Sequence, residues 1–200
     1  MADIESAQRF LDSYAATPPW DIGRPQPALQ AVSDQFTGRV LDVGCGTGEH
    51  ALLAASLGLD ATGIDAAPTA IERAKKKAGE RDLSARFIVG NALELGSLDE
   101  QFDTIVDSGL FHVFSDDERA RYVASLAAAL APGGRYFMLC FSDSQPGDWG
   151  PRRVTETEIR GSFADGWRVD DITATQLEIN EDPEVPAGPV DAWRVAATRL

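Results

Sequence analysis

The sequence predicts an α/β protein built on a doubly wound, mostly parallel sheet of seven strands with an antiparallel last strand. Strand-like and helix-like segments alternate from about residue 39 onward, and such alternation is typical of a parallel sheet with helices on both faces. The last two strand-like segments break the alternation, because only the loop "NEDPEVPAGP" separates them. That short connection predicts an antiparallel pair at the end of the sheet.

The expected elements follow from local signals. Pro68 suits the first turn of a helix, and Ser115 with Glu118 forms a capping box at the start of another. The same spacing at Thr155 and Glu158 predicts one more short helix. Apolar residues at helical spacing predict a helix at about 4–14, and further helices are expected at 28–36 and 49–57. The helices that begin at Pro68 and after Ser115 are expected at 68–79 and 116–130. Strands are expected at 39–44, 59–65, 85–91, 102–109, 135–141, 167–179 and 190–200.

Bulk properties limit the classes of function. We expect one domain over residues 1–200, in which residues 1–37 precede a core at 38–200. A net charge of −14 argues against nucleic-acid and acidic-membrane partners. No apolar run is long enough to cross a bilayer, and acidic residues stand where a secretory signal needs basic ones, so we expect a cytoplasmic protein.

Few residues of the chain suit a metal site or a basic binding patch. The two cysteines, Cys45 and Cys140, and the two histidines lack the spacing of metal ligands, so no metal is expected. The one basic run, Lys75 to Lys77, lies in a predicted helix and is interpreted as a solvated face. Small uncharged or weakly charged molecules remain the natural partners.

The segment "VLDVGCGTGEH" (40–50) combines a strand, a turn and the start of a helix. In a doubly wound sheet, ligands bind where the carboxyl ends of the strands meet the helix starts. Gly44, Gly46 and Gly48 lack Cβ atoms, so a ligand can reach the N–H groups of the turn. A nicotinamide site needs a third glycine at position 49, where Glu49 would oppose a pyrophosphate. The Gly-Lys-Ser/Thr of a P-loop is also missing.

With the segments that follow it, "LDVGCGTG" resembles motif I of the class I S-adenosylmethionine-dependent methyltransferases, which reads E/D-x-G-x-G-x-G. "GID" ends the next strand, "GNALEL" follows the third, and "LAPGGRYFML" resembles the turn and strand that the family has at its fifth strand. The antiparallel final pair is also a feature of that family. The resemblance covers residues 38–200 and implies a Rossmann-like fold, S-adenosylmethionine as cofactor and a small-molecule methyl acceptor.

The resemblance also assigns cofactor-binding roles. Asp65, with its neighbour Ala66, falls where the family holds the ribose hydroxyls. Asn91, followed by Ala92, replaces the aspartate that the family places at the adenine, and an amide can still hydrogen-bond the adenine edge; a turn residue without a ligand is the alternative. Asp107 ends the fourth strand and is interpreted as a cofactor-side or structural group. Motif I itself implies cofactor contacts from Asp42, Gly44, Cys45, Gly46 and Gly48.

The stretch "PPWDIGRPQP" (18–27) is too rich in proline for a helix and lies directly before the core. It is similar to the PWD-x-G-R segment of the thiol, halide and thiopurine methyltransferases and of bacterial relatives that methylate hydroxylated heterocycles. The resemblance implies an N-terminal helical lid in which Trp20 packs against the cofactor and Arg24 or nearby backbone closes the site; a surface loop packed by Trp20 alone is the alternative. Proline stiffness reduces the entropy lost when such a segment closes.

The chemistry depends mainly on positioning, because the sulfonium of S-adenosylmethionine is already activated. A base helps where a hydroxyl is methylated, and His112 lies just beyond the fourth strand. His112 is therefore a candidate catalytic base or hydrogen-bond donor to the substrate, and a loop-packing role beside Ser115 is the alternative. Nearby aromatic residues are candidates for an apolar pocket: Phe111, Phe114, Phe141 and Trp149.

The leading hypothesis is methyl transfer to an O, S or N atom of a small aromatic or heterocyclic molecule. The alternatives are a thiol or halide methyltransferase, a nicotinamide-dependent oxidoreductase and a non-catalytic cofactor-binding domain.

Overall fold

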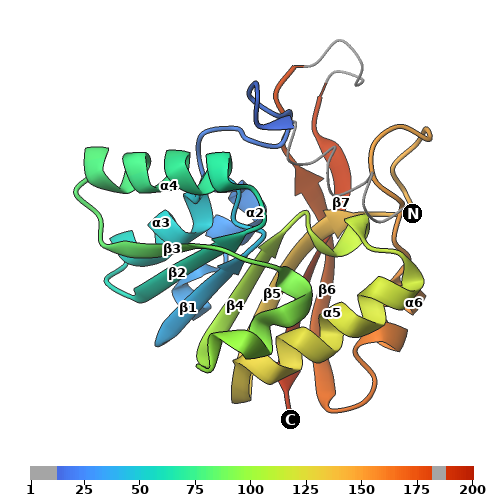
Figure 1. Cartoon of the computed structure of the whole chain (residues 1–200). Coiled ribbons are helices and arrows are strands. Elements are labelled where there is room, and N and C mark those ends of the chain that lie inside the picture. Colours follow the sequence, from blue (N-terminus) through green and yellow to red (C-terminus); the bar gives the residue numbers. More distant parts are fainter. Residues whose placement is uncertain (1–12, 182–187) are drawn as a thin grey trace.

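The computed structural model describes residues 13–181 and 188–200, which form one seven-stranded sheet. The strands are β1 (Arg39–Val43), β2 (Asp60–Asp65), β3 (Ala85–Val89), β4 (Phe102–Ser108), β5 (Leu130–Phe141), β6 (Trp167–Leu177) and β7 (Val190–Arg199). Their order is β3-β2-β1-β4-β5-β7-β6 (Figure 1). Strands β1 to β5 pair in parallel, whereas β7 runs antiparallel to both β5 and β6. The predicted fold class is confirmed, including the final pair.

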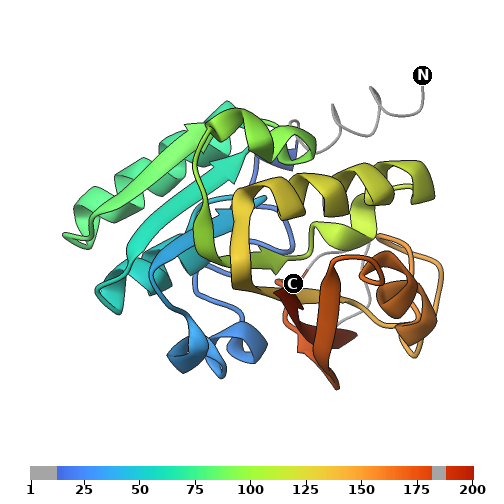
Figure 2. The same ribbon diagram turned by 90° about the horizontal axis from the view of Figure 1, so that it is seen from below.

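Helices cover both faces of the sheet. They are α2 (Pro27–Gln30), η1 (Ser33–Gln35), α3 (Glu49–Ser56), α4 (Pro68–Glu80), η2 (Ala92–Leu98), η3 (Phe111–Val113), α5 (Asp116–Ala129) and α6 (Glu156–Ser162). Figure 2 shows α5 on one side of the sheet and α2 with η1 on the other. One core cluster joins the sheet to α5 and α6, and two others join it to α2, α3 and α4. Burial of these apolar faces is the main stabilising contribution.

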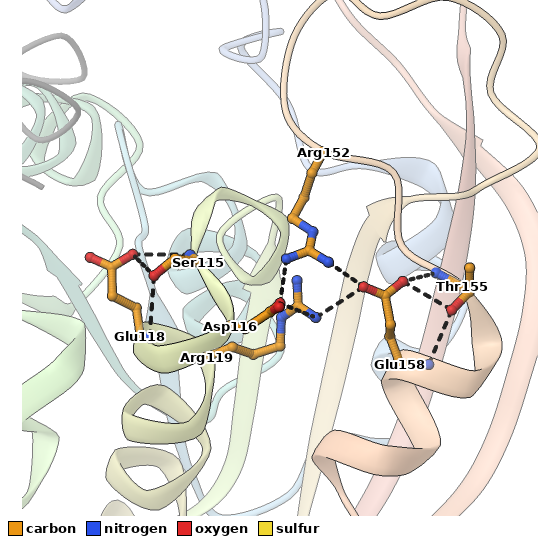
Figure 3. Close-up of polar contacts among 7 residues, drawn as sticks. All are labelled: Ser115, Asp116, Glu118, Arg119, Arg152, Thr155 and Glu158. Atoms are coloured by element: carbon orange, nitrogen blue, oxygen red, sulfur yellow. Dashed lines mark hydrogen bonds and ion pairs between the residues drawn. The ribbon is translucent and has the colours of Figure 1, made fainter. Parts of the chain in front are cut away.

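Most predicted elements fall within two residues of their observed bounds, and both capping boxes are present (Figure 3). The predicted helix at 28–36 is instead two short helices, because Val32 leaves the helical region with φ −116° and ψ 10°. The η2 turn was not predicted. The helix predicted at 4–14 lies almost wholly outside the described residues. Within the described part of the chain, no helix has the length and apolar character to span a membrane.

Candidate functional site

The turn between β1 and α3 has a backbone that only glycine adopts easily. Gly44, Gly46 and Gly48 have φ values of +67°, +52° and +89°, in the left-handed region that costs other residues conformational energy. The turn is held to the next strand, since the Cys45 N–H donates to the Ile64 carbonyl at 3.0 Å. The sequence therefore fixes a turn of bare backbone at the carboxyl end of the sheet.

The glycines of this turn have different neighbours. A Cβ on Gly48 would lie 2.7 Å from the Phe87 ring and 2.9 Å from Ala74, so Gly48 allows β3 and α4 to pack closely. Among the described residues, a Cβ on Gly46 would come close only to the end of the Tyr14 side chain, with the hydroxyl at 2.8 Å. Gly46 therefore lies beneath Tyr14, whereas Gly48 serves packing.

Asp65 lies beside the glycine turn at the end of β2. Its Oδ2 accepts the Gly46 N–H and its Oδ1 accepts the Ala67 N–H, both at 2.8 Å. Burial raises the pKa of this carboxyl. Each carboxylate oxygen has a second lone pair, so Asp65 can still accept hydroxyl donors. Its neighbour Ala66 is exposed. The structure thus brings together the two features on which the ribose prediction rests.

Asp42 and Cys45 are buried within the fold. Asp42 is 1% exposed, its Oδ2 accepts the Ala51 N–H of α3 at 3.0 Å, and burial raises its pKa to about 7. Burial likewise raises the pKa of the Cys45 thiol, so that side chain is a neutral packing group. Asp42 thereby joins β1 to α3, and the Cys45 side chain packs in the apolar cluster of α3, α4 and β3. The contact that Cys45 can offer a ligand is through its backbone.

Asn91 and Ala92 follow β3 on the same edge of the sheet as Asp65. The Asn91 Oδ1 accepts the Leu93 N–H at 2.9 Å and caps η2. Asn91 is exposed, and the adjacent Gly90 N–H donates to the Asp65 carbonyl at 3.0 Å. The predicted adenine and ribose residues therefore lie side by side.

The proline loop (Pro18–Pro27) lies above the carboxyl ends of the strands, beside the β6–β7 hairpin (Figure 1). Trp20 is 40% exposed and its Nε1–H donates to the Tyr14 hydroxyl at 3.3 Å. Tyr14 in turn is the side chain above Gly46. Arg24 does not lie over the glycine turn, because it forms an exposed ion pair with Glu178 just after β6. The Arg24 side chain therefore joins the loop to the hairpin and does not close the site, and closure by nearby backbone stays a prediction.

Other residues fasten this loop, and the sequence did not single them out. The Thr47 hydroxyl donates to Asp21 at 2.8 Å, which joins the loop to the glycine turn. Gln26 donates its amide to the Glu178 carbonyl at 2.8 Å and accepts the Glu178 N–H at 2.9 Å. The Gln26 N–H also donates to Nε2 of His50, at 3.1 Å. The loop is thus held by the core on one side and by the hairpin on the other.

The charge of Glu49, at the start of α3, is compensated. Lys77 donates to its Oε1 at 2.7 Å, and Arg81 contacts both of its carboxylate oxygens at 2.7 and 2.9 Å. Glu49 therefore does not present an unpaired charge, and the predicted repulsion of a pyrophosphate lacks its physical cause. The interpretation of Lys77 as part of a solvated face is also wrong, because its ammonium lies against Glu49 and Thr47.

Asp107 organises the turn that follows β4. It is fully buried, its Oδ2 accepts the hydroxyls of Tyr122 (2.8 Å) and Tyr136 (2.7 Å), and its Oδ1 accepts the Leu110 N–H at 2.8 Å. Burial raises the pKa of Asp107 to about 6, although these hydrogen bonds oppose the shift. Of the two roles predicted for Asp107, this geometry fits the structural one.

His112 lies in the same turn and joins it to the end of β5. Its Nδ1 accepts the Phe141 N–H at 2.9 Å, and the two rings meet edge to face at 4.9 Å. Burial lowers the pKa of His112 to about 3, against a hydrogen bond with the Gly109 backbone. A neutral imidazole with Nδ1 accepting has its proton on Nε2, so it offers no lone pair to a substrate proton. This arrangement does not fit a general base.

Within residues 13–181 and 188–200, no cluster of three or more His, Cys, Asp or Glu side chains is placed to hold a metal ion.

The strand order, the glycine turn after β1 and the carboxylate after β2 define the class of doubly wound domains that bind a nucleoside-containing cofactor. A family model described as a methyltransferase domain matches residues 40–134. The chain is 42% identical to 2-heptyl-1-hydroxyquinolin-4(1H)-one methyltransferase of Mycobacteroides abscessus over 176 residues, 86% of this chain and 78% of that protein. It therefore belongs to the class I S-adenosylmethionine-dependent methyltransferases, and S-adenosylmethionine is its cofactor.

Two further likenesses agree with this family. Demethylmenaquinone methyltransferase of Thermus thermophilus is 37% identical over 132 residues, 65% of this chain and 59% of that protein. A solved structure described under conversion of a disulfide bond into a thioacetal group during echinomycin biosynthesis is 36% identical. It has a TM-score of 0.84, with 100% of this chain and 93% of that one covered.

Proposed function

We propose that this methyltransferase acts on an acidic hydroxyl group of a small heteroaromatic molecule. The observation that carries the proposal is the state of His112. Its Nδ1 is taken by the Phe141 N–H and its pKa is held near 3, so it does not remove a proton from the acceptor. Asp107 is likewise saturated by protein donors. An acceptor at these strand ends must then ionise on its own near neutral pH.

An N-hydroxyl or an enolic hydroxyl on an electron-poor ring has this property. The relative from Mycobacteroides abscessus, which aligns with 86% of this chain, is named for a 1-hydroxyquinolin-4(1H)-one. We therefore take 1-hydroxyquinolin-4-ones as the first acceptors to test. The charge of −14 does not favour a strongly anionic acceptor, which agrees with a ring carrying one ionisable hydroxyl.

The residues proposed to hold the cofactor are those around the glycine turn. Gly44 and Gly46 let the cofactor approach the backbone closely, because they lack Cβ atoms, and Asp65 accepts the ribose hydroxyls beside Asn91 and Ala92. Trp20 and Tyr14 cover the turn and exclude water. The bound cofactor supplies an activated methyl group, and the chain's own residues orient the acceptor and keep the site dry.

A second candidate is methylation of a sulfur atom. Thiolates need no base, and the solved structure at 36% identity is described in connection with disulfide and thioacetal chemistry. The same observation on His112 fits both candidates, so an acceptor panel has to separate them.

The test is methyl transfer from labelled S-adenosylmethionine to four acceptor types, with products identified by mass spectrometry. The acceptors are 1-hydroxyquinolin-4-ones, phenols of graded pKa, small thiols and iodide. We expect the hydroxyquinolones to be methylated fastest. Among the phenols, those with a lower pKa should be methylated faster. Faster transfer to thiols than to any hydroxyl would favour the second candidate. Tight cofactor binding without transfer to any of them would favour a non-catalytic domain.

A further inference from the structure

The loop that follows β5 is built around one arginine. Val154 returns to the strand end, where its N–H donates to the Phe141 carbonyl at 3.1 Å and its carbonyl accepts the Asp143 N–H at 3.1 Å. Residues 143–153 therefore form a loop beside the carboxyl ends of β4 and β5, and the two ends of this loop are joined by hydrogen bonds. Most of this segment is exposed and buries little apolar surface of its own.

The Arg153 guanidinium lies inside this loop and forms hydrogen bonds with its backbone. It has five N–H donors, and each has a carbonyl partner in the same loop. Nε donates to Gln145 (3.3 Å), Nη1 to Trp149 (2.7 Å) and Pro151 (2.6 Å), and Nη2 to Pro146 (3.3 Å) and Gly147 (3.1 Å). The full set of donors of one side chain is thus used to fold one segment.

The same guanidinium contacts two aromatic rings that pack against each other. It lies 5.3 Å from the ring centroids of both Phe141 and Trp149, within the range of a cation–π contact. Those two rings meet edge to face at 5.6 Å, and Phe141 also contacts the His112 ring. A continuous line of contacts therefore runs from Arg153 through Trp149 and Phe141 to the turn after β4.

We infer that Arg153 is a positioning residue for methyl transfer, because it folds residues 145–151 so that Trp149 packs on Phe141 and the two rings form a wall beside the acceptor. The inference rests on the proposed function in one respect, that the acceptor binds at the carboxyl ends of β4 and β5. Since every donor of Arg153 is engaged by the loop, it does not bind the acceptor directly. Its effect on the reaction passes through Trp149 and Phe141.

Arg153→Lys tests the inference, because an ammonium keeps the charge but has only three donors and no planar fork. Arg152→Ala is the matched control. Arg152 is the neighbouring arginine, and it reaches Asp116 and Glu158 in exposed ion pairs (Figure 3). Such pairs contribute little to stability. A third variant, Arg153→Ala, permits rescue by added ethylguanidinium.

The measurements are the KM and kcat for a 1-hydroxyquinolin-4-one, and the Kd for S-adenosylmethionine by calorimetry. We expect Arg153→Lys to raise the acceptor KM by about tenfold or more, the scale of a small misplacement of reacting groups. The cofactor Kd should stay unchanged, and ethylguanidinium should lower the KM of Arg153→Ala. If folded Arg153→Lys has the wild-type acceptor KM, the inference is overturned. An equal rise in the acceptor KM of Arg152→Ala would overturn it as well.

A second readout separates this inference from the proposed function. Hydrogen exchange of the amides in residues 143–152 is measured by mass spectrometry and needs no acceptor. If the wild type methylates no hydroxyquinolone, that result contradicts the proposed function and leaves the role of Arg153 in the loop to be tested separately. Faster exchange confined to this loop in Arg153→Lys would still show that Arg153 folds the loop, and exchange equal to wild type would overturn the inference.

Discussion

Replacement of Gly46 by alanine separates cofactor binding from folding. At φ +52°, an alanine costs about 1–2 kcal/mol of backbone strain. Of the residues that the structure describes, the new Cβ would meet only the hydroxyl end of Tyr14, a side-chain tip that can shift. In a domain of this size the strain lowers Tm by about 2–8 °C. Gly58→Ala is the matched control, because Gly58 has φ +79° and open space around its Cβ position.

The assay compares thermal unfolding with calorimetric titration of S-adenosylmethionine for both variants. We expect similar falls in Tm, because the strain is similar. Only Gly46→Ala should weaken cofactor binding, by about tenfold or more, equivalent to about 1.4 kcal/mol. A wild-type Kd in Gly46→Ala would refute the assignment of the glycine turn as the cofactor cradle. Equal losses of affinity in both variants would indicate an indirect effect of lower stability.

Three further predictions concern the carboxylates and the histidine. Asp65→Ala should raise the Kd for S-adenosylmethionine about tenfold or more, whereas Asp60→Ala, at the exposed start of the same strand, should leave it unchanged; equal affinities would show that the ribose lies elsewhere. Because the pKa of His112 is held near 3, the pH profile of kcat between about pH 5 and 8 should contain no ionisation that disappears in His112→Ala, and such an ionisation would restore the base hypothesis. His112→Ala should still lower kcat, because the tether to Phe141 is lost. Tyr136→Phe removes a donor to the Asp107 carboxylate and should cost about 2 kcal/mol, seen in urea unfolding. Since that hydrogen bond lowers the pKa of Asp107, its contribution is present while Asp107 is ionised and is lost as pH falls through about 6. A deficit that grows on acidification would contradict this sign.

The sequence predicted the fold well because its signals are local. The capping boxes at Ser115 and Thr155 and the proline at the start of α4 each act within one helical turn. The sequence has no helical segment between the last two strands, and this predicted that they pair antiparallel. The glycine turn and Asp65 were recognisable because both lie at strand ends, which a parallel sheet brings to one edge.

The side-chain roles were less predictable because their partners lie far away along the chain. The sequence left His112 open between a base, a donor to the substrate and a loop-packing residue, because its partner, the Phe141 N–H, lies 29 residues away. Lys77 looked solvated because its partner Glu49 lies 28 residues earlier. Similarly, no local pattern indicates that Gln26 pairs with the backbone of Glu178, 152 residues distant.

The most direct test of the central claim is a crystal structure of the protein with S-adenosylhomocysteine bound. We predict the ribose hydroxyls on the Asp65 carboxylate, the adenine beside Asn91, and the amino-acid end against the backbone of Gly44 and Gly46. A nucleoside bound elsewhere, with that turn contacting nothing, would contradict the account.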